Sequence, residues 1–562
     1  MKNTTTISTS AALPSLFTLH PSTTGAAAVW PAGLLVFPTY LTTLLLLLAS
    51  FALYLLQSRS DLQGKKPKTR HGGLPPGPKP WPVVGNLPQL FMKKPTFRWI
   101  LCFMKEMDTR IACVRVGSVH IIPVTCPELA REFLKKHDAI FADRPLTMGT
   151  HYSSRGFLSI AVAPWGDQWK KMRRVVASEV INPSRLRWLL EKRTEEADNL
   201  VRYVYSQCKS TTGAVVDVRV AARHYSANVI RKMMFGRRHF GEGRPDGGPG
   251  LEEQEHVEAL FTVLSLLYAF NISDYVPALR CLDLDGHERT MKQAIKIVNK
   301  YQEPIVDQRI EEWRSGLRKD PEDLLDVIVS INDDQGRPLL TAEEIKAQTA
   351  DLIYASVDNP SNAIEWAMAE MLNQPEVIRK AVEELDRVVG QQRLVQESDV
   401  PQLNYVKACA REAFRLHPIA PFNLPHVAMA DTTVAGYTIP KGSHVLLSRL
   451  GLGRNPAVWP EPHRFDPERH IRECTPGGAV DILEPDLRFI TFSTGRRGCM
   501  GAALGSAMTV MLLARLLQGF TWSVPHGKTC IELRESAHDL FLAEPLLAHA
   551  EPRLPPHLYP VH

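Results

Sequence analysis

The stretch Phe492–Gly501 reads FSTGRRGCMG and carries the strongest chemical signal in this 562-residue chain. Two glycines stand before Cys499 and a third stands two residues after it, so the backbone is free to turn tightly and to approach a flat partner. The apolar run that follows, AALGSAMTVMLLARLLQGF, predicts a helix. Cys499 is therefore expected at a helix N-terminus, where free N–H groups and the nearby charge of Arg497 favour a thiolate.

A thiolate held in this way is a ligand for a soft or borderline metal ion, and haem iron is one such partner. Two other interpretations of Cys499 remain open at this point. A lone cysteine is often a buried structural residue, and a thiol of low pKa can serve redox chemistry. No resolving cysteine lies nearby, and the nine cysteines of the chain include no CxxC pair, which argues against a disulfide scaffold or a zinc ribbon.

Three further constellations accompany the cysteine loop. Glu412 and Arg415 are spaced to share one face of a helix. Arg469, in the segment PERH, offers a second arginine, so that Glu412 is able to pair with both and to join two distant segments in a buried network. Trp169 and Arg173 stand one helical turn apart and bring two donors that suit the carboxylates of a bound cofactor.

In combination these motifs resemble those of the cytochrome P450 superfamily. The matches are FxxGxRxCxG at 492–501, ExxR at 412–415, PER at 467–469 and WxxxR at 169–173, in the order of that family. The resemblance implies a mainly α-helical fold with small β-sheets, and Cys499 as the axial ligand of haem b, which receives NADPH electrons through a reductase. It also implies haem-propionate contacts by Trp169, Arg173, His426 and Arg497, and a structural network of Glu412, Arg415 and Arg469 behind the cysteine loop.

An uncharged stretch at 33–56 is long enough to cross a ~30 Å hydrocarbon core as a helix. Basic residues follow it, so the positive-inside rule places the rest of the chain in the cytosol. We expect 1–32 to be lumenal, 33–56 to be a single anchor in the endoplasmic reticulum membrane, 57–86 to be a basic flank with a proline-rich hinge, and 87–562 to be the catalytic domain. The stiff segment 74–86, LPPGPKPWPVVGN, ends in apolar residues, which suggests that it docks onto the body.

The remaining chain shows neither an internal repeat nor a low-complexity linker, which predicts one mainly helical body. The formal charge of +6 is too small over this length to argue for nucleic-acid binding. Helical patterns occupy 126–136, 191–206, 257–269, 286–314, 341–372, 375–389 and 405–416, and strand-like runs occupy 111–116, 120–124, 432–435 and 444–447.

The expected helix at 341–372 should cross the oxygen-binding face of the haem, and here the chain departs from the common P450 pattern. An acid followed by a threonine is usual in that family, whereas this chain has Asp358, Asn359 and Pro360. Asn359 donates hydrogen bonds but does not deliver an acidic proton. Pro360 removes an N–H and is predicted to open or kink the helix. We expect these three residues to act in catalysis, with protons supplied by water or by the substrate.

The chain resembles the plant aldoxime-forming amino-acid N-monooxygenases, in particular grass enzymes acting on tyrosine or phenylalanine. The features that carry this resemblance are the Asn-Pro pair, His470 after PER and the sequence of the cysteine loop. The likeness extends from 81 to 560. It implies two N-hydroxylations of an L-amino acid, with an aromatic one expected, and an aldoxime released with loss of CO₂ and water, in cyanogenic glucoside or related defence metabolism. A carbon hydroxylase of plant secondary metabolism and an O₂-independent haem-thiolate lyase or isomerase remain alternatives.

An amino acid brings a carboxylate into a largely apolar pocket, where it needs a partner. The candidate substrate residues are Arg155, Phe157, Ser361, Phe422 and Asn423. Lys170, Lys171, Arg174 and Arg496 are expected to form a basic face for an acidic reductase.

Overall fold

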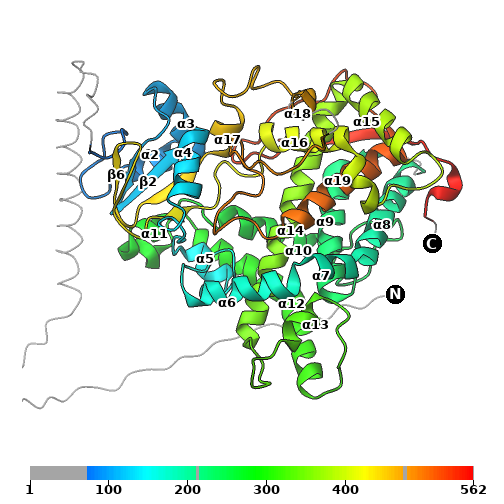
Figure 1. Cartoon of the computed structure of the whole chain (residues 1–562), viewed down its shortest axis with the longest axis horizontal. Coiled ribbons are helices and arrows are strands. Elements are labelled where there is room, and N and C mark those ends of the chain that lie inside the picture. The colour runs from blue at the N-terminus through cyan, green and yellow to red at the C-terminus, as the bar shows by residue number, and fades with distance from the viewer. Residues whose placement is uncertain (1–71, 210–213, 473–477, 561–562) are drawn as a thin grey trace, which may run out of the picture. The chain divides into compact units, whose positions relative to one another are not determined.

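The computed structural model describes residues 72–209, 214–472 and 478–560, and all of these belong to one compact unit (Figure 1). The expected lumenal segment, membrane anchor and basic flank lie outside the described residues. Among the described helices, one is apolar and long enough to cross a membrane: α19 (Ala502–Gly519), which is mostly buried in the body. Its apolar sequence therefore builds the core.

The centre of the body is α14 (Ala342–Leu372), which packs against α9 (Val218–Phe235), α16 (Asn404–Leu416) and α19. Thr341 and Glu344 form a capping box that starts α14. Nearly every residue of its second half is buried, because helices cover it on several sides. Figure 1 shows these helices in the middle of the body, while the strands β2 and β6 lie at its left.

Most predicted helices are confirmed with shifted ends. The segment 126–136 divides into α4 (Pro127–Arg131) and a π-helix (Glu132–Lys136). The others are α8 (Leu190–Cys208), α10 (Leu251–Leu266), α12 (His287–Arg314), α14, α15 (Pro375–Val388) and α16. Helices without a predicted range are α2 (Leu87–Met92), α3 (Thr96–Glu106), α5 (Met148–Ser153), α6 (Asp167–Val175), α7 (Pro183–Trp188), α9, α11 (Ile272–Tyr275), α13 (Leu324–Ser330), α17 (Arg449–Gly453) and α18 (Glu468–Arg472), together with a second π-helix (Val176–Val180) and 3-10 turns at Pro277–Leu282, Glu397–Gln402 and Pro556–Leu558.

The largest sheet has the order β1-β2-β7-β4, with β1 (Val114–Val116), β2 (Val119–Val124), β7 (His444–Leu447) and β4 (His426–Val427). Strands β2 and β7 are parallel, and β4 pairs with β7 so that His426 lies opposite Val445. The other sheets are β3 (Val215–Asp217), β9 (Leu547–Pro552) and β8 (Phe520–Ser523), and the pair β5 (Thr432–Val434) and β6 (Tyr437–Ile439). The small sheets thus confirm the expected fold class.

The described part of the proline-rich segment is docked onto the first sheet. The N–H of Cys113 donates to the Pro76 carbonyl at 2.8 Å. A Cβ at Gly77 would come within 1.8 Å of the Cys113 carbonyl oxygen, so the close approach requires glycine there. The Asn86 side chain donates to the Lys79 carbonyl at 3.1 Å and accepts from the Arg115 N–H at 3.1 Å.

The predicted opening of the helix at Pro360 is wrong, because α14 continues through this residue without a break. Side chains around the proline donate to carbonyls one turn back. Ser361 Oγ donates to the Val357 carbonyl at 2.8 Å, and Asn359 Nδ2 donates to that of Ala355 at 3.1 Å. Packing of α14 on its neighbours holds the helical path despite the missing N–H.

Candidate functional site

The cysteine loop is a tight turn that ends in α19. The Cys499 N–H donates to the Phe492 carbonyl at 2.8 Å, and the Gly498 N–H donates to the Gly495 carbonyl at 3.0 Å. Gly495 has φ +75°, and a Cβ there would lie 2.6 Å from the Leu134 carbonyl oxygen. Glycine is therefore required for the loop to lie against its neighbour.

The thiol of Cys499 is solvent-accessible although protein atoms surround it on most sides. Burial raises its pKa, and the Gly501 N–H together with the charges of Arg173 and Arg449 lowers it, with a net rise. The expected helix N-terminus is thus present, but it does not outweigh desolvation in the protein alone. Binding to a metal ion would itself favour the thiolate, because thiolates are the form that coordinates metals.

The charge of Arg497 was expected to favour the thiolate, but its guanidinium is turned to backbone carbonyls and to Trp169. Its guanidinium donates to the carbonyls of Ala142 at 2.6 Å and Ala163 at 2.8 Å, and it lies 4.6 Å from the ring centre of Trp169. Arg173 donates to the Gly498 carbonyl at 3.0 Å. The structure therefore brings the predicted propionate residues together beside the cysteine loop.

This cluster holds positive charge without a paired carboxylate. Burial and the nearby charges of Arg144 and Arg173 lower the pKa of Arg497 to about 9, against the opposite effect of Tyr268 and Asp143. Arg497 Nη1 and Arg144 Nε are buried without a hydrogen-bond partner, and neither arginine forms an ion pair within the described chain. Unpaired buried donors of this kind suit two incoming carboxylates, such as the propionates of a haem. Arg144 was not predicted, because a single arginine in a loop carries no periodic signal.

His426 lies in the same cluster. Its Nδ1 is 2.7 Å from the Phe141 carbonyl oxygen, which only accepts, so Nδ1 carries the proton in the neutral ring. Burial lowers its pKa well below the usual range, and Arg144 and Arg497 act in the same direction. His426 Nε2 is then an acceptor, and donation from it to a propionate would require a protonated ring.

Behind the cysteine loop, Glu412 forms a buried network with Arg415 and Arg469. The Arg415 Nη2 to Glu412 Oε1 distance is 2.7 Å, and the Arg469 Nε to Glu412 Oε1 distance is 3.0 Å. His470, which was not placed in this network from the sequence, lies 2.8 Å from Glu412 Oε2. Burial alone would raise the pKa of Glu412, but hydrogen bonds from Arg415 and His470 lower it to about 2. The network ties α16 to α18, as the motif predicted.

On α14, Asp358 has a carboxylate oxygen, Oδ1, that is buried without a hydrogen-bond partner. Burial raises its pKa to about 7, against the attraction of Arg223 and Arg449 and with the repulsion of Asp539. Ala355, about one turn before it, is exposed in the middle of an otherwise largely buried helix. An acid that titrates near neutral pH therefore stands on the predicted catalytic segment.

The predicted substrate residues differ in whether their side chains already have partners within the protein. Arg155 pairs with Glu303 and, at 2.6 Å, with Glu343. The ring centres of Phe157 and His151 are 5.4 Å apart. The hydroxyl of Ser361 is turned to the α14 backbone.

Phe422 and Asn423 lie on the segment between α16 and β4. Phe422 packs on Phe97, Leu450 and Leu540. Asn423 Nδ2 is 3.3 Å from the Ser493 hydroxyl of the cysteine loop, so this residue does reach the site.

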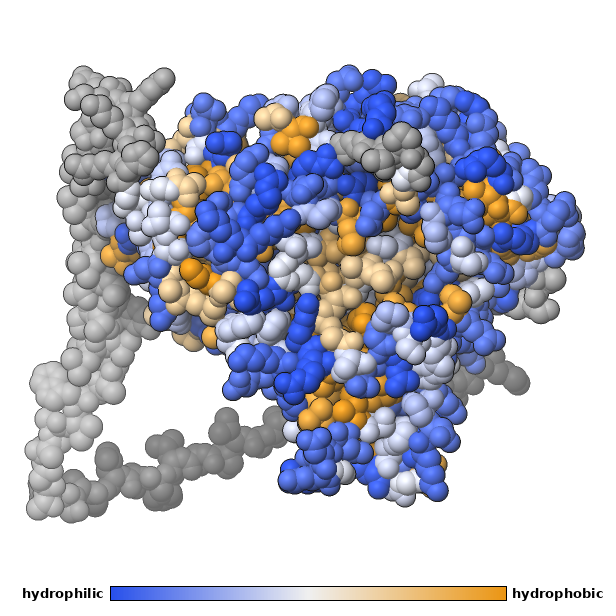
Figure 2. Space-filling view, in the orientation of Figure 1, coloured by the Kyte–Doolittle hydropathy of each residue, from blue (hydrophilic) through white to orange (hydrophobic). Residues whose placement is uncertain are grey.

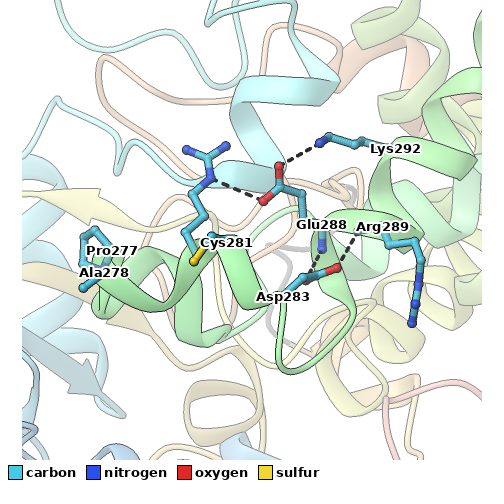
Figure 3. Close-up of a pocket in the computed structure, with 8 residues that line it drawn as sticks. Pro277, Ala278, Cys281, Asp283, Glu288, Arg289 and Lys292 are labelled. Atoms are coloured by element: carbon cyan, nitrogen blue, oxygen red, sulfur yellow. Dashed lines mark hydrogen bonds and ion pairs between the residues drawn. The ribbon is translucent and has the colours of Figure 1, made fainter. Parts of the chain in front are cut away.

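A surface pocket at the start of α12 contains none of these residues (Figure 3). Glu288 at its wall accepts from Tyr152 at 2.6 Å and pairs with Arg280 at 3.3 Å and Lys292 at 2.9 Å. The charge of Glu288 is thus already matched within the protein. Figure 2 shows the view of Figure 1 as a mostly hydrophilic surface with less polar residues gathered over its middle.

A mainly helical body, a glycine-shaped cysteine loop and unpaired cations beside it define a haem-thiolate protein. A family model described as cytochrome P450 matches residues 75–549, which is most of the chain. The chain belongs to the cytochrome P450 family. It therefore uses haem with a cysteine thiolate ligand, together with electrons supplied by a redox partner, and Cys499 with the Arg144, Arg173 and Arg497 cluster fits that group.

The chain is also similar to curated amino-acid N-monooxygenases. It is 62% identical over 489 residues to a tyrosine N-monooxygenase of Sorghum bicolor, which covers 87% of each chain. It is 61% identical over 497 residues to a phenylalanine N-monooxygenase of Arabidopsis thaliana, covering 88% of this chain and 93% of the relative. A valine N-monooxygenase of Manihot esculenta is 55% identical over 518 residues, covering 92% and 94%.

Proposed function

We propose that this protein hydroxylates the α-nitrogen of an L-amino acid twice and releases the aldoxime. Each hydroxylation consumes one O₂ and one NADPH and forms one water, and the dihydroxylated amine then loses CO₂ and water. The observation that carries this proposal is the identity of 62% and 61% to tyrosine and phenylalanine N-monooxygenases over nearly the whole catalytic body. These two relatives favour an aromatic substrate, for cyanogenic glucoside or related defence metabolism.

The residues have distinct tasks in this proposal. The bound haem supplies the oxygen chemistry. Cys499 would hold the iron, and the cluster of Arg144, Arg173 and Arg497 would hold the propionates. Asp358 and Asn359 on α14 place a proton-exchanging group and a hydrogen-bond donor beside the reacting nitrogen, while Pro360 leaves one backbone carbonyl without its helical N–H partner. Fixing the nitrogen over the reacting centre is what selects N-hydroxylation over carbon hydroxylation.

The test is turnover in microsomes with a plant reductase and NADPH. Phe, Tyr, Trp, Val, Ile and Met are supplied separately, and aldoximes are measured by mass spectrometry. We expect an aldoxime from at least one aromatic amino acid and none without NADPH. A hydroxylated carbon product instead of an aldoxime would favour the carbon hydroxylase, and turnover without NADPH would favour the lyase or isomerase.

We further propose that the anchor at 33–56 holds the protein in the endoplasmic reticulum membrane with its catalytic domain in the cytosol. The uncharged stretch and the basic residues behind it support this topology.

The reductase is proposed to dock on a basic face made by Lys170, Arg174 and Arg496. All three are exposed, and Arg496, which pairs with Asp138 at 2.6 Å, belongs to the cysteine loop. Lys171, expected on the same face, is instead half-buried and pairs with Glu344 at 2.8 Å. Reversing its charge would therefore disturb the start of α14.

Reversing Lys170 and Arg174 together to Glu is expected to slow reductase-driven turnover by roughly an order of magnitude at low ionic strength, because like charges weaken a steered encounter. Substrate affinity should stay the same, and the effect should shrink as salt is added. The matched control reverses Lys319 and Arg387, two exposed cations outside this face. Equal turnover of wild type and the Lys170/Arg174 variant across the salt range would refute the docking face.

A further inference from the structure

Arg449 is a half-buried cation that none of the sequence motifs includes. It opens α17, directly after β7, and its backbone N–H donates to the Pro421 carbonyl at 2.9 Å. Its Nη2 lies 3.4 Å from Asn423 Oδ1, while its Nε is buried without a hydrogen-bond partner. It forms no ion pair within the described ranges. A guanidinium with an unused buried donor suits an incoming carboxylate.

Arg449 is linked to the cysteine loop through Asn423, whose Nδ2 lies 3.3 Å from the Ser493 hydroxyl, and the charge of Asp358 on α14 also acts on it. Burial lowers its pKa to about 10, and the groups that oppose this are Asp358 and Cys499. It remains a cation at neutral pH. None of Arg144, Arg173 and Arg497 is among the charges that act on Arg449, although Asn423 Nδ2 also lies 3.5 Å from Nε2 of His426. Arg449 is therefore available to a second carboxylate.

The other arginines around the site are less free. Arg155 already pairs with Glu303 and Glu343. Arg223, which also acts on Asp358, lies with its guanidinium 3.9 Å from the ring centre of Phe261 and 5.8 Å from that of Phe541. Its charge is partly matched by those aromatic faces.

We propose that Arg449, positioned by Asn423, binds the α-carboxylate of the amino-acid substrate. Asp358 then provides the opposite charge for the α-amino end, so that the pair recognises both ends of the zwitterion and places its nitrogen towards α14. This inference rests on the proposed function. It assigns the carboxylate to Arg449 rather than to Arg155.

The experiment compares two ligands that differ only in the carboxylate. Full-length holoenzyme is titrated with L-tyrosine and tyramine, or with L-phenylalanine and phenethylamine if turnover selects that substrate, and dissociation constants are read from the haem absorbance shift. In Arg449→Gln we expect the amino acid to bind roughly 10- to 150-fold more weakly, the effect of losing a hydrogen bond to a charged group. The amine should bind as in wild type. Arg449→Lys should restore part of the preference, because it keeps the charge but not the planar fork.

Two matched variants separate this role from a general change in charge. Arg223→Gln also removes a cation that acts on Asp358, and Arg155→Gln removes the earlier candidate, and both should keep the wild-type ratio of the two affinities. A selective loss in either of them instead of Arg449→Gln would overturn the proposal. Equal weakening of the binding of both ligands in Arg449→Gln would also overturn it. The same holds if Arg449→Gln and Arg449→Lys lose part of their haem while the ratio of the two affinities stays at the wild-type value. If wild type makes aldoximes and the ratio does not move, this inference alone fails; if wild type makes none, the proposed function fails.

Discussion

Replacing Cys499 with Ser is expected to abolish monooxygenase turnover and the thiolate-type spectrum of the reduced CO complex. Cys499 is the sulphur at the head of α19, in a loop shaped by Gly495 and Gly498. A serine hydroxyl is not deprotonated at neutral pH and is a hard ligand, so it does not replace a thiolate on haem iron. The measurement is the reduced CO spectrum together with aldoxime formation.

The matched control is Cys530→Ser, which changes another exposed cysteine of the described chain. It should retain both the spectrum and turnover. A thiolate-type spectrum in Cys499→Ser would show that another residue ligates the iron and would reopen the structural and redox interpretations of Cys499.

Replacing Glu412 with Gln is expected to destabilise the body by about 3–5 kcal/mol, the range for removing one partner of a buried ion pair. Glu412 and Arg415 are both fully buried, and Arg469 is 7% exposed, so water cannot compensate the two guanidinium groups. Because α16 and α18 are joined through this carboxylate, we also expect loss of haem on purification. Urea unfolding followed by circular dichroism, and haem content per protein, measure the two effects.

Acid adds a second readout for this network. The pKa of Glu412 falls from 4.5 to about 2 on folding, so its stabilisation is complete above pH 4.5 and is lost as the pH falls towards 2. Wild type should therefore lose more stability over this window than Glu412→Gln. The control Glu376→Gln removes a 62% exposed partner of Arg379 on α15 and should change stability by less than about 1 kcal/mol. Equal effects of the two substitutions would contradict the assigned role of Glu412.

The fold could be predicted well because its signals are local. Helices such as 286–314 and 375–389 show apolar periodicity over several turns, and the structure has α12 and α15 within one residue of these limits. The strands β3, β8 and β9 were not predicted, because they are short and pair only with distant segments. The expected opening of the helix at Pro360 is absent for a similar reason, since the local penalty of proline is opposed by tertiary packing that the sequence does not display.

The candidate site divides in the same way. The sequence alone determined the cysteine, the ExxR network, the WxxxR pair and the family, because each is a spacing along one short segment. Only the tertiary structure decided which charges meet. It pairs Lys171 with Glu344 and Arg155 with Glu303, and adds Arg144 to the propionate cluster and His470 to Glu412. It also places Arg449 where the charge of Asp358 acts on it but no ion pair forms among the described residues. The physical reason is that a charge's partner is set by distance and burial in space, whereas a motif records only separation along the chain.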